Sequence, residues 1–132
     1  MSPILDVGID LLVGFMKKPE GLDEFLLGQG YVLQEDHPAG AITNVAVRKF
    51  RYERRGLSLS GVSCCCFDGV DVDDQEFWTT LTGDVPVVST ATLSTPKARN
   101  GFDEMVQYMT ATQLRNRYAA VVFDAYDGEV LE

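Results

Sequence analysis

Two extended runs near the middle of the chain constrain the fold more than any other feature. Residues 41–55 are rich in Val, Phe and Tyr with charged residues between them, and residues 57–67 continue in this way after Gly56. Such runs on either side of a glycine are typical of two antiparallel strands joined by a turn. We therefore expect a long β-hairpin and a largely antiparallel sheet.

The apolar residues before this hairpin recur at helical spacing. A first helix is expected between residues 2 and 18, because Ser2-Pro3 suits a helix start and Pro19 disfavours continuation. Its apolar side chains recur at helical spacing: Leu5, Ile9, Leu12 and Met16. A shorter helix follows around Leu22–Leu26, and a strand is expected from Tyr31.

Helices and strands alternate after the hairpin. Asp73 and Glu76 have the spacing of a capping box for a third helix, and a β-branched strand follows at residues 85–93. A fourth helix is expected after Asn100, with its buried side at helical period: Phe102, Met105, Val106 and Met109. Strands on either side of Asp127-Gly128 complete an expected order of ααβββαβαββ.

One domain should contain all of these elements. The chain has 132 residues, with no internal repeat, no low-complexity run and no Pro/Gly/Ser-rich linker. We therefore expect a single α+β domain over residues 1–132, with helices packed on one face of the sheet.

The balance of charge narrows the range of partners. The chain contains 11 Lys and Arg residues and 20 Asp and Glu residues, which gives a net charge of −9. This field repels nucleic acids and anionic membranes and favours a basic protein. Asp6 and Asp10 interrupt any secretion signal at the N-terminus. No stretch has the roughly 20 apolar residues that a membrane span requires. Three consecutive cysteines suit a reducing compartment. We expect a cytoplasmic protein.

Acidic residues are concentrated after Phe67. Residues 68–76 hold five carboxylates, whose spacing does not fit an EF-hand calcium loop. A solvated turn and helix cap explains part of the cluster, and binding of a basic partner is the functional alternative. The candidate partner contacts are Asp68, Asp71, Asp73, Asp74 and Glu76, with Asp124 and Asp127 as secondary candidates.

Basic residues are concentrated on the first arm of the hairpin. Five of the 11 fall within residues 48–55, with aromatic residues between them. This pattern suits an exposed strand guarded against edge pairing, a self-associating surface, or an anion site for single-stranded nucleic acid. The excess of Asp and Glu in the rest of the chain argues against a nucleic-acid site. The residues of this candidate surface are Arg48, Lys49, Arg51, Tyr52, Arg54 and Arg55.

Catalytic and cofactor motifs are weak. In an extended run Cys64 and Cys66 share one face and Cys65 takes the other, so the three thiols cannot converge on a metal. His37 is the single histidine, and a Cys–His hydrolase would have to pair it with a cysteine across the fold. No Gly-rich phosphate loop is present. We expect no cofactor and no metal, and leave enzymatic activity open.

The last hairpin carries the one family resemblance. The segment Phe123–Val130 resembles the closing hairpin of PepSY-type domains, which are often associated with protease inhibition. The likeness consists of strand, Asp-Gly turn and strand, which hairpin chemistry alone produces. No function is carried over from it.

These features together favour a protein that acts by binding another macromolecule. The leading hypothesis is a stoichiometric inhibitor of a basic protein, of the toxin-immunity, antitoxin or phage counter-defence kind. One alternative is a structural subunit of an assembly, a homo-oligomer joined through the strand at residues 48–55. Another is a small hydrolase or transferase.

Overall fold

The computed structural model describes residues 8–41, 43–53, 61–96 and 101–131, in which three helices are interspersed among seven strands. The strands are β1 (Ile9–Phe15), β2 (Tyr31–His37), β3 (Val47–Tyr52), β4 (Ser63–Phe67), β5 (Ser89–Thr95), β6 (Val121–Asp124) and β7 (Glu129–Val130). The helices are α1 (Leu22–Gly28), α2 (Val72–Thr82) and α3 (Gly101–Tyr118). The expected α+β class is confirmed.

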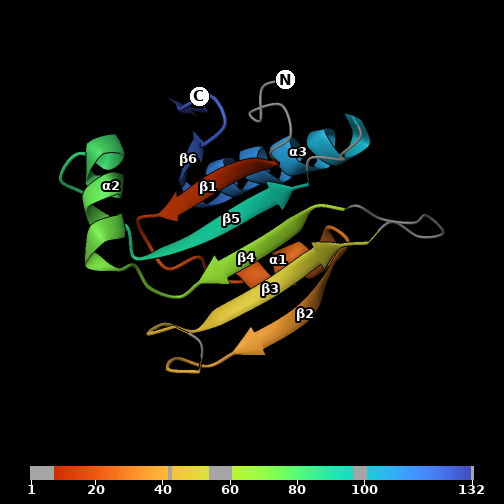
Figure 1. Ribbon diagram of the computed structural model, residues 1–132, viewed down its shortest axis with the longest axis horizontal. Coiled ribbons are helices and arrows are strands. Elements are labelled where there is room, and N and C mark those ends of the chain that lie inside the picture. The colour runs from red at the N-terminus through yellow and green to blue at the C-terminus, as the bar shows by residue number, and fades with distance from the viewer. Residues whose placement is uncertain (1–7, 42, 54–60, 97–100, 132) are drawn as a thin grey trace, which may run out of the picture.

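All seven strands form one antiparallel sheet with the order β2-β3-β4-β5-β1-β6-β7 (Figure 1). Strands β3 and β4 pair with Phe50 opposite Cys64, which confirms the expected hairpin pairing. Residues 54–60, between these strands, lie outside the described ranges. Strand β1 lies in the interior of the sheet, where Leu11 is opposite Leu93 of β5 and Asp124 of β6.

Strand β1 replaces the helix that the sequence predicts between residues 2 and 18. Ile9, Leu11 and Val13 are buried in the alternating pattern of a strand, whose side chains point to opposite faces in turn. Leu12 and Gly14 point to the other face, part of which α2 covers. A strand that is apolar on both faces also satisfies helical spacing, which explains the error. Residues 1–7 lie outside the described ranges.

Helices α1 and α3 cover one face of the sheet and enclose the main core (Figure 1). Leu22 and Leu26 of α1 and Leu114 of α3 pack against the buried side chains of the central strands. Apolar burial on this scale is the main source of folding free energy. The core cluster is Ile9, Leu11, Val13, Phe15, Leu22, Leu26, Tyr31, Phe50, Val62, Cys64, Cys66, Ala91, Leu93, Val106, Ala111, Leu114, Ala120 and Val122.

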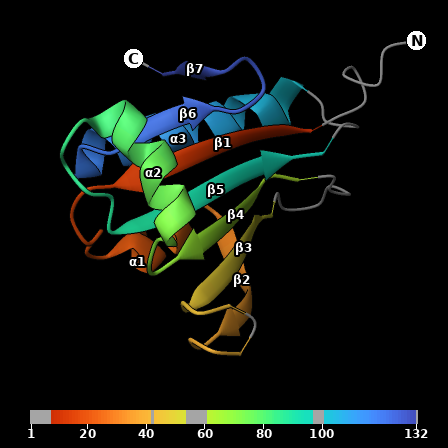
Figure 2. The same cartoon turned by 60° about the vertical axis from the view of Figure 1, so that its left-hand side comes forward.

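Helix α2 lies against the opposite face, near the end where β4 leads into β5 (Figure 2). Gly14 permits this approach, because a Cβ atom at Gly14 would lie 2.8 Å from the Trp78 ring. Phe77 packs edge-on against Phe123 of β6, with ring centroids 5.1 Å apart. The expected packing of helices on one face therefore holds for α1 and α3, while α2 leaves most of its own face of the sheet open.

Helix α3 turns a partly polar side to the core. Gln107 donates hydrogen bonds to the carbonyl oxygens of Ile9 and Leu93, both at 2.8 Å, and accepts one from Thr95 at 3.0 Å. Met105 and Met109, expected in the core, are instead 49% and 51% exposed. The internal bonds of Gln107 satisfy a polar side chain that the sequence pattern assigns to the surface.

The sheet has its long open edge at β2. Strand β3 pairs with β2 on one side and with β4 on the other, so it is not the exposed strand that the basic residues suggested. β2 carries Glu35 and Asp36, charges that discourage further strands from adding to an edge.

Candidate protein-binding site

Helix α2 begins two residues before the position that the capping pattern predicts. Asp71 is its N-cap, with an extended backbone (φ −69°, ψ 159°), and the Asp71 side chain makes no capping hydrogen bond. Asp73 and Asp74 lie in the first turn, where the helix dipole favours negative charge. The carboxylate of Asp71 is therefore available to other groups.

The exposed carboxylates of α2 and its N-cap form what we call the α2 acidic surface. All of them are exposed, and none has an ion-pair partner among the described residues. The neighbouring sequence offers little compensation, since residues 56–96 contain no Lys, Arg or His. This surface comprises Asp71, Asp73, Asp74 and Glu76, four of the five carboxylates predicted in this segment.

Asp68, the fifth, is engaged within the fold. Its two carboxylate oxygens each accept a hydrogen bond of 2.8 Å from Nη1 of Arg48, and Asp23 of α1 accepts one of 2.9 Å from Nε. Partial burial works against the charge of Arg48, but the bonds to Asp68 and the charge of Asp23 outweigh it and raise the Arg48 pKa. This triad joins the predicted acidic and basic clusters, so Asp68 and Arg48 neutralise each other.

A cleft of about 210 Å³, which we call the α2 cleft, lies between α2 and the open face of the sheet. Val45, Phe67 and Trp78 contribute apolar surface to it, and Thr90 and Thr92 of β5 add hydroxyl groups. Asp71 and Asp74, one helical turn apart, supply carboxylates from the acidic surface. All the side chains that line it are neutral or acidic.

Two contacts hold α2 beside this cleft. Trp78 is 3% exposed and packs on Gly14 of β1. Gln75 clamps the segment before β5, since its side chain donates to the Val87 carbonyl at 2.8 Å and accepts from the Val87 amide at 3.0 Å. Sequence reasoning missed the cleft because its walls come from α2, β4, β5 and the segment before β3. Only the carboxylates gave a local signal.

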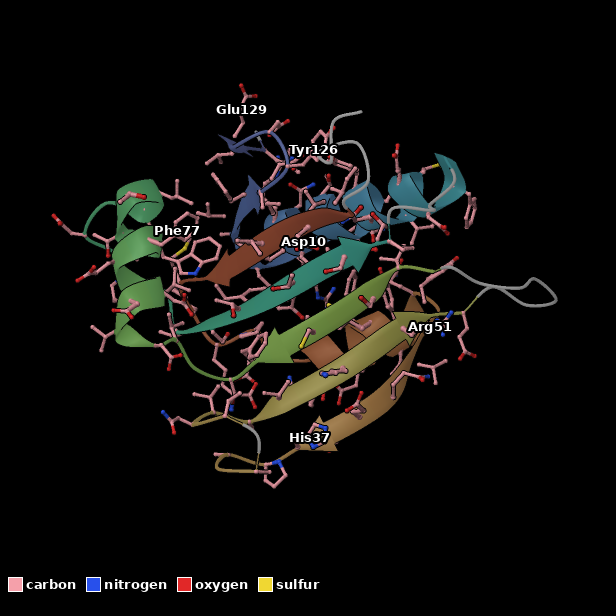
Figure 3. All side chains as sticks on the ribbon, viewed as in Figure 1. Asp10, His37, Arg51, Phe77, Tyr126 and Glu129 are labelled. Carbon is pink, nitrogen blue, oxygen red and sulfur yellow. The ribbon has the colours of Figure 1, made fainter. Side chains whose placement is uncertain are left out.

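The predicted basic surface is divided between the two faces of the sheet. Lys49 and Arg51 lie on the open face, while Arg48 and Tyr52 point to the side of α1 and α3. Lys49 lies 3.9 Å from Glu35 of β2. In Figure 3, Arg51 and Asp10 lie on β3 and β1, on the face of the sheet opposite α1 and α3.

The remaining two bases of that prediction, Arg54 and Arg55, lie outside the described residues. Tyr52 stacks edge-on with Tyr31, with centroids 5.4 Å apart, and contributes to the core. The described bases therefore do not form one continuous surface.

The two secondary acidic candidates differ in exposure. Asp124 is 2% exposed and accepts hydrogen bonds from the Tyr108 hydroxyl at 2.6 Å and the Tyr126 amide at 2.9 Å. It is a structural group of the last hairpin and presents no carboxylate to a partner. Asp127 is exposed and accepts a bond from the Glu129 amide at 3.1 Å. Figure 3 labels Glu129 in this hairpin, at the C-terminal end.

The cysteines do not form a nucleophilic site with His37. Cys64 and Cys66 are buried on the core side with their sulfur atoms 3.9 Å apart, as the expected alternation requires. The hydrogen bond with Cys66, followed by burial, raises the pKa of Cys64 well above its ordinary value. Partial burial raises the pKa of Cys65, which lies on the open face. His37 is two strands away on β2 and bonds Glu35 at 2.9 Å.

A second groove, of about 570 Å³, lies beside the Arg48 triad. Lys18 and Arg48 line it together with acidic side chains from α1 and from the segment before it. The charges are mixed and the Arg48 guanidinium already binds two carboxylates, so this groove offers less charge selectivity than the α2 cleft.

Comparisons with protein-family models, curated proteins and solved structures returned no significant match. Within the described ranges, no helix has the length and apolar character needed to cross a membrane. The same residues contain no group of three or more His, Cys, Asp or Glu side chains arranged to hold a metal ion.

Proposed function

We propose that this protein binds a basic protein through the α2 acidic surface and the α2 cleft, and neutralises that partner stoichiometrically. The toxin-immunity, antitoxin and counter-defence proteins are the classes that act in this way. The observation that carries the proposal is the exposed, uncompensated charge of Asp71, Asp73, Asp74 and Glu76. Such charge accelerates encounter with a basic partner and selects against acidic ones.

The α2 cleft supports the same function through its size. Small-molecule sites usually occupy about 300–1,000 Å³, whereas this cleft of about 210 Å³ suits a single protein side chain. Lys and Arg combine an apolar stem with a cationic head. The stem would pack on Phe67 and Val45 while Asp71 and Asp74 bind the head, as in the central contacts that dominate interface energies.

The other functions have less support. A Cys–His hydrolase requires a base beside a reactive thiol, whereas Cys65 and His37 lie two strands apart and the Cys65 pKa is raised. A subunit joined edge to edge through β3 conflicts with the interior position of that strand.

Affinity capture tests the proposal directly. The immobilised protein is incubated with extract of its native host at low and at high salt, and retained proteins are identified by mass spectrometry. We expect a basic protein that is retained at low salt and reduced at high salt, and whose purified activity is abolished by one equivalent. If no basic protein is retained at low salt, or if its activity is unchanged by excess protein, the proposal is wrong.

Matched variants locate the contact. Asp71→Asn/Asp74→Asn removes the carboxylates of the cleft, and we expect affinity for the captured partner to fall about 100-fold, or ~3 kcal/mol. Glu53→Gln/Glu129→Gln removes the same charge from exposed positions elsewhere and should change affinity less than about threefold. Equal losses in both variants would show that net charge alone drives binding.

A second arm of the test needs no partner. Trp78 is the one tryptophan of the chain and lines the α2 cleft, so its fluorescence reports on occupancy. A blocked arginine peptide should perturb it with a dissociation constant of about 1–10 mM, while the citrulline peptide, neutral and of the same shape, should not. A response of equal size to both peptides, or one that persists in Asp71→Asn/Asp74→Asn, would contradict a cation-selective cleft.

A further inference from the structure

The outer side of α3 carries an apolar stripe that the fold does not use. The buried side of this 18-residue helix includes Val106, Ala111 and Leu114. Met105 and Met109 lie on the opposite side, each about half exposed. Methionine is ordinarily among the buried residues, and exposed methionine side chains are typical of adaptable binding surfaces.

This stripe forms a shallow apolar groove of about 360 Å³. Met105, Tyr108 and Met109 line it together with Thr112 and Gln113, so every lining side chain is uncharged. The lining of the α2 cleft, by contrast, includes the carboxylates of Asp71 and Asp74, so the two surfaces differ in chemistry. A surface without charge does not select the basic partner proposed for α2.

Charge along α3 indicates what can cover the stripe. Glu104 in the first turn and Arg115 in the last turn are partly exposed, whereas Asp103 is buried and Arg117 lies over the rings of Phe25 and Tyr118. An antiparallel copy of the same helix places acidic turns beside basic turns and opposes the two helix dipoles, whereas a parallel copy places like charges together. A two-fold symmetric contact requires this kind of self-complementarity.

We propose that the stripe is the contact between two copies of this chain, with their α3 helices antiparallel and crossing near Met109. In this arrangement Met109 meets its own counterpart, and Met105 faces Gln113 of the other copy. Glu104 approaches Arg115 of the other copy on the flank of the contact. The proposal is independent of the function assigned to α2.

The size of the stripe sets the strength of the contact. Helix α3 is about 27 Å long at 1.5 Å per residue, and one helix pair covers less than the roughly 1,200 Å² at which stable interfaces begin. The two copies therefore form a concentration-dependent dimer rather than a permanent one.

Sedimentation equilibrium tests the association. Between about 10 μM and about 1 mM protein, the weight-average mass should rise from the monomer value of 14.6 kDa towards twice that value. Met109→Glu places two carboxylates together at the crossing and should keep the mass at the monomer value throughout. Val72→Glu adds the same charge at a side chain that is 79% exposed on α2, and should dimerise as the parent does.

Disulfide trapping tests the orientation. In a Cys65→Ser background, Met109→Cys should give a covalent dimer under mild oxidation because the two positions meet. Met105→Cys should stay monomeric, because its counterpart lies about eight residues, or ~12 Å, along the other helix, beyond the ~7 Å limit for a disulfide. Trapping of both variants would indicate parallel helices, and trapping of neither, with a constant monomer mass, would overturn the proposal.

Discussion

Cysteine reactivity is the residue-scale property that separates an enzyme from a binding protein here. Partial burial raises the Cys65 pKa, and the bond with Cys66 together with burial raises that of Cys64. A raised pKa means a smaller thiolate fraction at a given pH, and the thiolate is the reactive form.

We expect iodoacetamide to modify Cys65 at pH 8 more slowly than a free thiol of ordinary pKa, because burial raises the Cys65 pKa and lowers its thiolate fraction. Cys64 and Cys66 should react only after unfolding in urea, where all three thiols become equivalent. The measurement is the time course of modification by peptide mass spectrometry. Modification of Cys65 faster than the unfolded control would revive the nucleophile hypothesis.

Helix α3 shows at the element scale how a polar side chain holds a helix to a sheet. Gln107 is fully buried and bonds Ile9 of β1 and Leu93 of β5, two strands that are neighbours in the sheet. Gln107→Leu keeps the volume and leaves these carbonyl oxygens and the Thr95 hydroxyl short of partners.

We expect this substitution to lower the free energy of unfolding by about 2–4 kcal/mol, since each buried polar group without a partner costs about 1–3 kcal/mol. Urea denaturation measures the change. Gln29→Leu, at an exposed position at the end of α1, is the control and should shift stability by less than about 0.5 kcal/mol. Equal stability of the Gln107 variant and the parent would show that these bonds contribute nothing net.

Local patterns were sufficient to predict every element after the first, and insufficient where burial depends on distant segments. The hairpin β3–β4 follows from alternation around Gly56, and α2 ends at Gly83, whose φ of 69° favours glycine. β1 was misassigned because both of its faces contact other elements. Met105 and Met109 were wrongly assigned to the core because Gln107 lies on the buried side of α3 in their place. The bonds of Gln107 to β1 and β5 cannot be inferred from the sequence.

Only the local part of the candidate site could be predicted from the sequence. The α2 acidic surface follows from composition, because its carboxylates lie in a segment, residues 56–96, that contains no Lys, Arg or His to neutralise them. Asp68 and Asp124 could not be separated from it by sequence, since their partners Arg48 and Tyr108 are 20 and 16 positions away. The cleft required the sheet register as well.

At the scale of the whole molecule, two surfaces of different chemistry occupy different elements. The α2 acidic surface would hold a basic partner by charge, whereas the α3 stripe would join two copies that each carry a net charge of −9. Salt screens attraction in the first case and net repulsion in the second. A rise in ionic strength should therefore weaken capture of the partner and strengthen the dimer.

The interior position of β1 has a consequence for how the chain reaches this fold. Its neighbours are β5 and β6, so that Leu11 pairs with residues 82 and 113 positions later, Leu93 and Asp124. Contacts of such long range form slowly, because the loop between them must close first. On the ribosome both edges of β1 would be unpaired until β5 has left the exit tunnel, and one edge would remain unpaired until β6 follows. The sheet can thus be completed only once β6 has been made, with the hairpin β3–β4 as the part able to form earlier.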